Sequence, residues 1–449
     1  MELADFKDLV FEKAKRAGFT DYEIYYEKGN AFLAKIYNGE VKEFKNAKSA
    51  GLSFRGNYNG KTGYSYTAKI DADAAEFLIE SAKSGAAVID EEKETIYAGS
   101  EKYIQLEDEK VSEMPAAEKI EKAKVMEKAA YGEDARIKQV PHAAVGNSEG
   151  EIHIFNSAGL NLSRKSNIAY AYVYAQAEEN SQTKMGWDIF AGKDFTGFDE
   201  VGLAKKAVKN AVVMLGARDV KTGKYPVIFE NKIAADLIAV YSGIFFAENV
   251  QKGFSLLGGK IGEKIASDIF TLNDYALCDK SLSQIPFDSE GVAAYNKAVI
   301  KNGILETYLY NLKSAARDNT VSTGNGFKGS YKSPVTTACL NFFVSPGETT
   351  EDELLEKMVD GIYVNGLAGL HSGTNAVSGD FSLKADGFIV QGGKISYPIE
   401  QFTVAGNFYE LIKNIKGIAD NLFFDLPGGG GTFGSPSLYV GEVKVSGGE

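Results

Sequence analysis

The first half of the chain repeats one order of predicted elements, and this repetition constrains the fold more than any other feature. An amphipathic helix is predicted over residues 3–17, because apolar residues recur there at helical spacing until a glycine ends the pattern. Short strands such as 22–26 and 31–37 follow, and Asp71 can cap a second helix. Between residues 116 and 215 a helix, several strands and a helix occur again. The sequence therefore predicts two similar blocks, each made of a helix, a β-meander and a helix.

The second half is predicted to be one larger, β-rich unit. Lys-Asn-Gly at 301–303 and Gln-Gly-Gly at 391–393 are typical of tight hairpin turns. Asn231 is predicted to cap a helix, and another helix is predicted near residues 350–359. Because the strands run as hairpins beside helices, the fold class is predicted to be α+β rather than doubly wound α/β. The predicted domains are residues 1–110, 111–222 and 223–449, with the charged segment 90–113 read as linker and strand.

Charge and cysteine content narrow the classes of function. The chain carries 61 acidic and 49 basic side chains, a net charge of −12, which disfavours a broad nucleic-acid surface. Its two cysteines, Cys278 and Cys339, make no disulfide framework and suit a reducing compartment. The first residues do not resemble a signal peptide, and the longest apolar stretch, 234–247, is too short to span a bilayer and contains Asp236. We expect a soluble, cytoplasmic protein that binds neither nucleic acid nor a membrane.

A self-contained His/Cys zinc site is not expected. Such a site needs several donors that converge. The three histidines, His142, His153 and His371, are never within one helical turn of each other, although the first two could face one another across a hairpin. The cysteines have no paired spacing. A site built only from carboxylates stays open.

A nucleophile motif is present but lies in the wrong context. Residues 146–150 read Gly-Asn-Ser-Glu-Gly and match G-x-S-x-G, which requires a turn from a strand into a helix. The next residues, 151–155, alternate as a strand, so the segment is predicted to be a hairpin turn. Ser148 with His142 or His153 remains the basis of an alternative in which the chain is a hydrolase in its own right.

Two glycine-rich segments do not support nucleotide binding. Residues 324–329 match G-x-G-x-x-G, but no strand is predicted before them and no helix after them. Residues 253–260 resemble a phosphate-binding loop only loosely, because Ile261 lies where Ser or Thr must bind magnesium.

The densest cluster of small polar residues lies between residues 371 and 382. It reads His-Ser-Gly-Thr-Asn and then, after two residues, Ser-Gly-Asp-Phe-Ser. A histidine in a glycine-rich loop is most often structural, yet polar loops of this kind often carry function. His371, Ser372, Asn375 and Asp380 are therefore the candidates for peptide binding or for a subunit interface.

The whole run 369–381 resembles the signature of the TldD/PmbA family. Segments 259–266, 288–291 and 323–326 fit the same family in the right order, so the resemblance spans nearly the whole chain. It implies two similar α+β blocks followed by a larger β-rich domain. Members of the family are known as modulators of DNA gyrase and as peptide-maturation proteases, so the resemblance implies a function in proteolysis.

The resemblance also implies a role within a pair of chains. The TldD type carries His-Glu-x-x-x-His on a helix and a later cysteine, which hold zinc, and its PmbA or TldE partner lacks them. In this chain the corresponding window, 238–243, reads Ile-Ala-Val-Tyr-Ser-Gly, and no cysteine follows Cys339. Aliphatic side chains cannot bind zinc, and Ala239 lies where the general base would be. We therefore expect no catalytic residue, metal ligand or cofactor in this chain.

The favoured hypothesis is a non-metal subunit of a cytoplasmic metallopeptidase complex. Its expected partners are a TldD-like zinc-bearing subunit and an unfolded peptide held by sheet-edge hydrogen bonds. The chain is also expected to be able to form a homodimer when alone. One alternative is the independent hydrolase described above. The other is a binding protein that modulates DNA gyrase or an antitoxin without proteolysis.

Overall fold

The computed structural model describes residues 1–89, 93–100, 102–106 and 114–448. The elements of its first half are α1 (Leu3–Ala17), β1 (Tyr22–Tyr37), β2 (Glu40–Tyr58), β3 (Lys61–Thr67), α2 (Ala72–Val88), α3 (Ala116–Glu133), β4 (Ile137–Asn156), β5 (Asn161–Glu179), β6 (Gln182–Gly192) and α4 (Glu200–Val212). A helix, three strands and a helix therefore occur twice, as the sequence predicts. Asp71 caps α2 by accepting a hydrogen bond from the Ala74 N–H. No strand forms in the described parts of segment 90–113; its other residues lie outside the described ranges.

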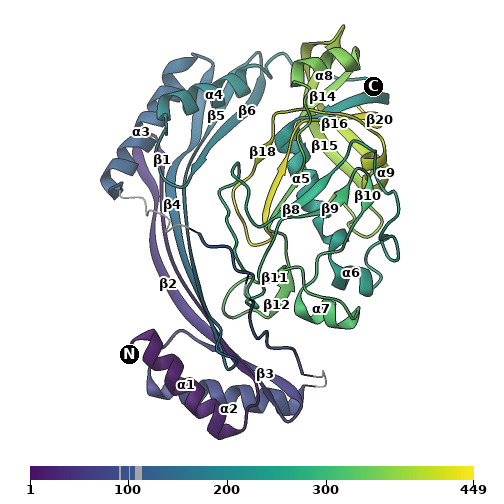
Figure 1. The fold of residues 1–449 in the computed structure, drawn as a ribbon. Helices are drawn as coiled ribbons and strands as arrows, with labels where there is room; N and C mark the ends of the chain where they lie inside the picture. Colours follow the sequence, from purple (N-terminus) through teal and green to yellow (C-terminus); the bar gives the residue numbers. More distant parts are fainter. Residues whose placement is uncertain (90–92, 101, 107–113, 449) are drawn as a thin grey trace.

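The two blocks share one antiparallel sheet. Its strand order is β3-β2-β1-β4-β5-β6, so the first strand of each block lies at the centre. β1 and β4 pair from Glu23 opposite Asn156 to Ile36 opposite Ala143. Figure 1 shows the sheet as a long curved layer, with α1 and α2 at one end and α3 and α4 near the other. The α+β class is confirmed, and the two blocks are halves of a single sheet.

The strands are longer than the sequence predicts. The predicted strands 22–26 and 31–37 are parts of β1, and the hairpin turn predicted at 146–150 is wrong, because those residues lie inside β4. Gly146 allows a close approach there instead of a turn. A Cβ at this position would lie 2.6 Å from the Tyr170 ring and 2.7 Å from the Phe32 carbonyl oxygen. Glycine in a strand thus marks close packing as well as turns.

The second half is rich in β-structure, as predicted. Its elements are β7 (Gly223–Phe229), α5 (Asn231–Tyr241), η1 (Ser242–Phe245), α6 (Ala247–Gln251), β8 (Leu272–Tyr275), β9 (Lys297–Lys301), β10 (Ile304–Leu305), α7 (Leu312–Arg317), β11 (Gly326–Lys328), β12 (Val335–Thr337), β13 (Asn341–Val344), α8 (Glu351–Met358), β14 (Gly361–Ala368), β15 (Asp380–Gln391), β16 (Lys394–Asn407), α9 (Phe408–Lys413), β17 (Ile415–Ile418), β18 (Phe423–Phe424), β19 (Thr432–Ser435) and β20 (Leu438–Ser446). The hairpin turns predicted at 301–303 and 391–393 join β9 to β10 and β15 to β16.

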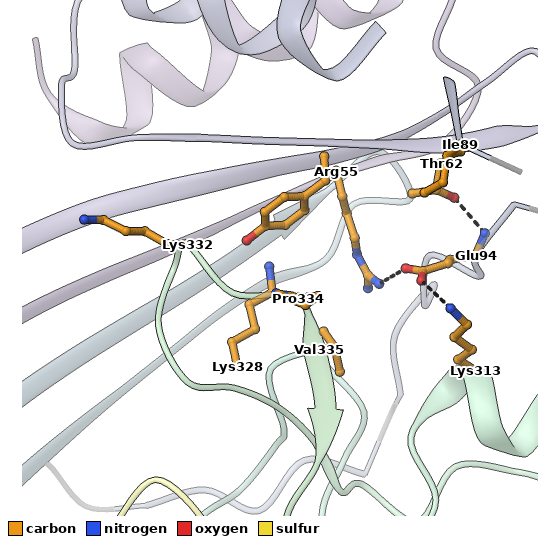
Figure 2. Close-up of a pocket in the computed structure, with 10 residues that line it drawn as sticks. Arg55, Thr62, Ile89, Glu94, Lys313, Lys328, Lys332, Pro334 and Val335 are labelled. Carbon is orange, nitrogen blue, oxygen red and sulfur yellow. Dashed lines mark hydrogen bonds and ion pairs between the residues drawn. The ribbon is translucent and has the colours of Figure 1, made fainter. Parts of the chain in front are cut away.

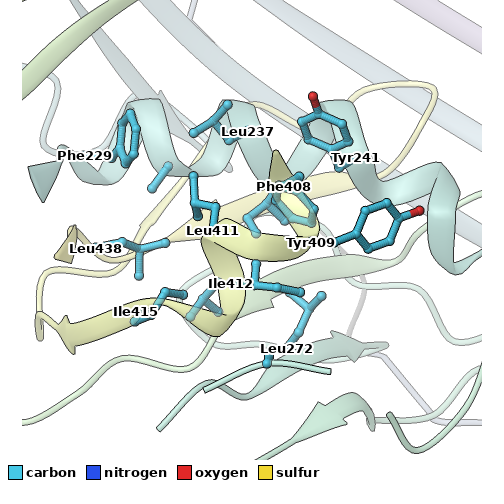
Figure 3. Packing of buried hydrophobic residues seen from close by; sticks show 14 of the residues in the cluster. Phe229, Leu237, Tyr241, Leu272, Phe408, Tyr409, Leu411, Ile412, Ile415 and Leu438 are labelled. Carbon is cyan, nitrogen blue, oxygen red and sulfur yellow. The ribbon is translucent and has the colours of Figure 1, made fainter. Parts of the chain in front are cut away.

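Two six-stranded sheets organise this half. One has the order β10-β9-β8-β13-β19-β18, and the other β16-β15-β14-β7-β20-β17. In the second sheet β16 also pairs with β20, which closes a small barrel. The main core lies around α5 and α9, where Leu237 and Tyr241 pack with Phe408 and Leu411 (Figure 3). The predicted cap of α5 is wrong: helix α5 begins at Asn231 itself, whose amide donates to the Asn421 carbonyl oxygen.

The curved sheet meets the second half through a buried cluster of charges. The Arg55 side chain on β2 is only 4% exposed. Its guanidinium lies 3.1 Å from the carboxylate of Glu23, 3.3 Å from that of Glu94 and 3.6 Å from that of Glu290. Glu290 belongs to the second half, so one guanidinium holds carboxylates from both halves. Burial raises the pKa of Glu290 to about 7, and the Arg55 charge opposes that rise.

We predict that Arg55→Met lowers the free energy of unfolding by about 3–5 kcal/mol. The substitution leaves Glu23 buried without its cation, and an uncompensated buried charge is strongly destabilising. Arg16→Met is the matched control, because Arg16 is 78% exposed and its pair with Glu12 is a surface pair worth less than about 1 kcal/mol. Urea unfolding of both variants measures the difference. Equal losses in the two variants would contradict the role of the cluster.

Candidate functional site

The polar loop singled out in the sequence joins β14 to β15. His371 and Ser372 are exposed at its turn. The side-chain oxygen of Asn375 accepts from the N–H groups of Val377 and Ser378, so it shapes the loop. The Asp380 carboxylate accepts from Asn407 Nδ2 and Ser378 Oγ, and these bonds lower its pKa. Asn375 and Asp380 therefore order the loop. The binding or interface role expected of His371 and Ser372 stays a prediction.

The loop lies directly against the end of α5. The Tyr241 hydroxyl donates to the backbone carbonyl oxygen of Asp380 at 2.9 Å, and its ring stacks on Phe408 with centroids 4.5 Å apart. The neighbouring Ser242 hydroxyl donates to the Ala239 carbonyl oxygen. Ile238 and Tyr241 are buried in the main core. The window 238–243 is thus filled by packed apolar and aromatic groups, and it anchors the polar loop.

His142, His153 and the serine motif all lie on β4. Within the described ranges, no group of three or more His, Cys, Asp or Glu side chains is placed to hold a metal ion. His142 and His153 both lie on β4, so they do not face each other across a hairpin. His153 Nε2 is 2.8 Å from the Glu151 carboxylate. Ser148 is exposed on the same strand, between its cross-strand neighbours Ala31 and Ile168, and the segment does not make the strand-to-helix turn of a nucleophile elbow.

A cleft lies between the curved sheet and the barrel. It has a volume of about 530 Å³ and is lined by residues 183–187 of β6, by α5 and by residues 365–367 of β14. Its acidic lining residues are Glu230, Asp236, Asp386, Glu400 and Asp425, and its basic ones are Lys184, Lys232 and Lys384. Carboxylates therefore outnumber ammonium groups on its walls. The middle of the β14–β15 hairpin lines the cleft, and the loop with His371 lies at the end of the same hairpin.

Two carboxyls of this cleft are strongly affected by burial. Burial raises the pKa of Glu230 to about 7, although the nearby Lys232 opposes the shift. Burial raises the pKa of Asp236 to about 6, and the charge of Asp425 adds to the rise. Perturbed carboxyls in a cleft are typical of functional sites, though structural networks produce them too. The cleft changes its charge close to neutral pH.

Aromatic and basic groups bridge the two walls of the cleft. Trp187 of β6 is the single tryptophan of the chain and is 40% exposed. The Lys232 ammonium of α5 lies 5.1 Å from the centre of its ring and pairs with Asp188 at 2.9 Å. Lys184 of β6 pairs with Glu400 of β16. These contacts hold β6 beside α5 and β16, and they leave the indole ring of Trp187 on the cleft wall.

A second hollow, shown in Figure 2, lies at the buried charge cluster. Its volume is about 350 Å³. Lys328 donates to Ser53 Oγ at 2.8 Å and lies over the rings of Tyr25 and Tyr64, and burial lowers its pKa to about 8. Glu94 holds Arg55 on one side. Because these groups already pair across the junction, we assign this hollow to the junction between the two halves.

The comparisons with known proteins settle the family. Models described as PmbA/TldA metallopeptidase domain 1, central domain and C-terminal domain match residues 22–86, 109–215 and 222–447. The chain belongs to the PmbA/TldD metallopeptidase family. The resemblance seen in the sequence is therefore confirmed.

Individual relatives agree with this assignment. A metalloprotease PmbA homologue of Buchnera aphidicola is 30% identical over 324 residues, which are 72% of this chain and 68% of the relative. A Thermotoga maritima protein described as a proposed modulator of a DNA gyrase is 29% identical, with a TM-score of 0.91 over 99% of this chain and 100% of that one. TldE of Thermococcus kodakarensis, 23% identical, has the same fold, with a TM-score of 0.89 over 98% of this chain and 100% of that one.

Sequence reasoning missed the cleft, because its walls come from segments far apart in the chain. One signal was present: Asp236 interrupts the longest apolar stretch, and a carboxylate there must face something other than the core. The G-x-G-x-x-G segment does not open a helix: residues 326–328 within it form β11, and Asn325 is fully buried with its amide donating to Asp274. No helix of the described residues is long and apolar enough to cross a membrane.

We predict that Glu230→Gln flattens the pH dependence of stability between about pH 4.5 and 7. Because the pKa of Glu230 is raised, the folded chain keeps a proton in this range that the unfolded chain releases, so the free energy of unfolding falls as pH rises through it. The difference removed by the variant is about 3 kcal/mol. Urea unfolding across this range is the measurement. The exposed Glu348→Gln is the control, and equal slopes in both variants would contradict the assignment.

Proposed function

We propose that this chain is the non-metal subunit of a two-chain metallopeptidase that degrades or matures unfolded peptides. The observation that carries the proposal is the packing of residues 238–243. Where the TldD type is expected to carry zinc ligands, this chain has Ile238 and Tyr241 buried in the main core and Tyr241 stacked on Phe408. Neither an aliphatic nor a stacked phenol side chain supplies the ligand set of a zinc site. The zinc chemistry of the complex then belongs to a TldD-like partner.

The acidic cleft supports a role in holding substrate. β6 is an edge strand of the curved sheet, and five consecutive residues of it line the cleft. An extended peptide that pairs with such an edge gains main-chain hydrogen bonds with little selection of sequence. The excess of carboxylates on the walls favours peptides with basic side chains. His371 and Ser372, at the end of the neighbouring hairpin, are proposed to contact the peptide or the partner.

We predict that an unfolded basic peptide changes the fluorescence of Trp187. The indole is part of the cleft wall, so a bound peptide alters its exposure to water. Asp386→Lys places a positive charge on that wall and should weaken binding about tenfold. Asp352→Lys, on the exposed surface of α8, is the matched control and should bind as the original chain does. A peptide that binds without any change at Trp187 and equally to both variants would place its site elsewhere.

We also predict that the purified chain neither cleaves unfolded casein nor retains zinc after dialysis, and that cleavage appears when a His-Glu-x-x-x-His partner is added. The partner is sought by purifying the tagged chain from its own source and identifying near-stoichiometric companions by mass spectrometry. Cleavage by this chain alone, abolished by Ser148→Ala, would instead support the independent hydrolase. Retention of gyrase in place of a peptidase companion would support the non-proteolytic binding protein.

A further inference from the structure

Half of β2 is an open strand edge. β3 pairs with β2 only from Leu52, opposite Thr67, to Tyr58, opposite Lys61. Before that point β2 pairs with β1 on one side, and among the strands of the described residues it has no partner on the other. All eleven residues from Glu40 to Ala50 are exposed. An unpaired edge of this length is a ready template for another strand.

The charges along this edge are arranged so that the strand complements itself. The segment 40–48 reads Glu-Val-Lys-Glu-Phe-Lys-Asn-Ala-Lys. When two copies are laid antiparallel with Phe44 opposite Phe44, Glu43 meets Lys45 and Glu40 meets Lys48. By symmetry each of these opposite-charge pairs occurs twice. Cross-strand pairs of opposite charge and of aromatic rings both stabilise antiparallel pairing.

The neighbouring registers lack this complementarity. In a two-fold antiparallel pair, facing residues must lie on the same face of the sheet, so the centre must fall on a residue. A register centred on Lys42, Glu43 or Lys45 puts that charge opposite itself. A register centred on Asn46 pairs no charges of opposite sign. Among the registers centred on residues 42 to 46, only the one centred on Phe44 avoids every like-charge contact and makes opposite-charge ones.

We propose that two copies of this chain associate through antiparallel pairing of their β2 edges, centred on Phe44. The 40–48 pairing fits the space that the fold leaves. The turn at Asn38-Gly39 takes the partner strand away before it reaches Leu52, where β3 begins to pair. The exposed rings of the two Phe44 side chains, each 54% exposed in one chain, cover each other. The two curved sheets become one continuous sheet.

Lysines on an exposed edge can also have the opposite effect, because they protect strands from pairing with another chain. That protection needs like charges to meet, and here Glu40 and Glu43 remove the repulsion in one register. Lys35 of β1 already pairs with Glu43 at 2.7 Å. Glu40 and Lys48 have no ion-pair partner within the described part of the chain, so they are the sharper pair to test.

The test is a charge swap measured by sedimentation over a concentration series. Glu40→Lys and Lys48→Glu each turn two attractive pairs into two repulsive ones, so each variant should dimerise at least about tenfold more weakly. The double variant E40K/K48E restores both pairs and should dimerise as the original chain does. A mixture of the two single variants should also dimerise, because its mixed pairs are complementary. Lys128→Glu, exposed on α3, is the control for net charge.

The register is tested by cross-linking. In a chain with Cys278→Ser, Phe44→Cys should form an intermolecular disulfide on mild oxidation, because the two Cβ atoms face each other in the pair. Lys42→Cys should not, since its facing residue is Asn46. A chain that stays monomeric throughout the concentration series overturns the proposal. So does a dimer that the single charge reversals leave unchanged, or one that Lys42→Cys links as readily as Phe44→Cys.

These outcomes are separate from those of the proposed function. The charge swap reports on association of identical chains and needs neither zinc, peptide nor protease activity. If the chain pairs through Phe44 but never supports cleavage, the proposed role as a peptidase subunit is refuted and the edge pairing stands. If the chain supports cleavage with its partner but the charge swap does not change its self-association, the edge pairing is refuted and the role as a peptidase subunit stands.

Discussion

The fold depends on one buried guanidinium. Arg55 sits on β2, and its side chain reaches Glu23 on β1 and Glu290 in the second half of the chain. Charges buried at such a junction are costly unless each finds its partners, so the two halves are held in one relative position at that point. Burial raises the pKa of the neighbouring Asp288 well above its usual range, and the charge of Glu290 adds to this, so the cluster limits its own negative charge. The Tyr64 hydroxyl, which donates to the carbonyl oxygens of Tyr331 and Ser333, continues the same junction.

The shared sheet follows from the way its central strands pair. If each block had formed a sheet of its own, β1 and β4 would both have been edges. Their pairing removes those edges and extends the layer in both directions from the centre. It leaves β6 at one side and, at the other, residues 40–50 of β2, which β3 does not cover. One side lies beside the acidic cleft, and the other is the exposed edge. The pairing that makes the sheet long therefore also leaves the two edges at which we propose that another chain adds a strand.

The sequence predicted the order of elements well and their extents poorly. Asp71 and the turns at 301–303 and 391–393 act through neighbouring residues, so local chemistry was enough to place them. Gly146 was misread because its role comes from Tyr170 on another strand, which no local pattern reveals. For the same reason the polar loop was found while the cleft was not: the loop is one continuous segment, whereas Trp187 and Asp236 meet only after folding. Asn231 illustrates a third cause, because its amide makes a distant bond to Asn421 in place of a cap.

Under the proposed function, the end of α5 is the position at which this chain has packing groups in place of zinc ligands. A metal site buried beside a core needs polar donors, and such donors without a metal are costly to bury. Replacing them with Ile238 and Tyr241 turns the position into packing, and the one polar group kept there, the Tyr241 hydroxyl, is satisfied by the Asp380 carbonyl oxygen. That bond fixes the first residue of β15 and with it the loop that carries His371. The helix end therefore positions the loop, and under the proposed function the zinc chemistry is supplied by a partner chain.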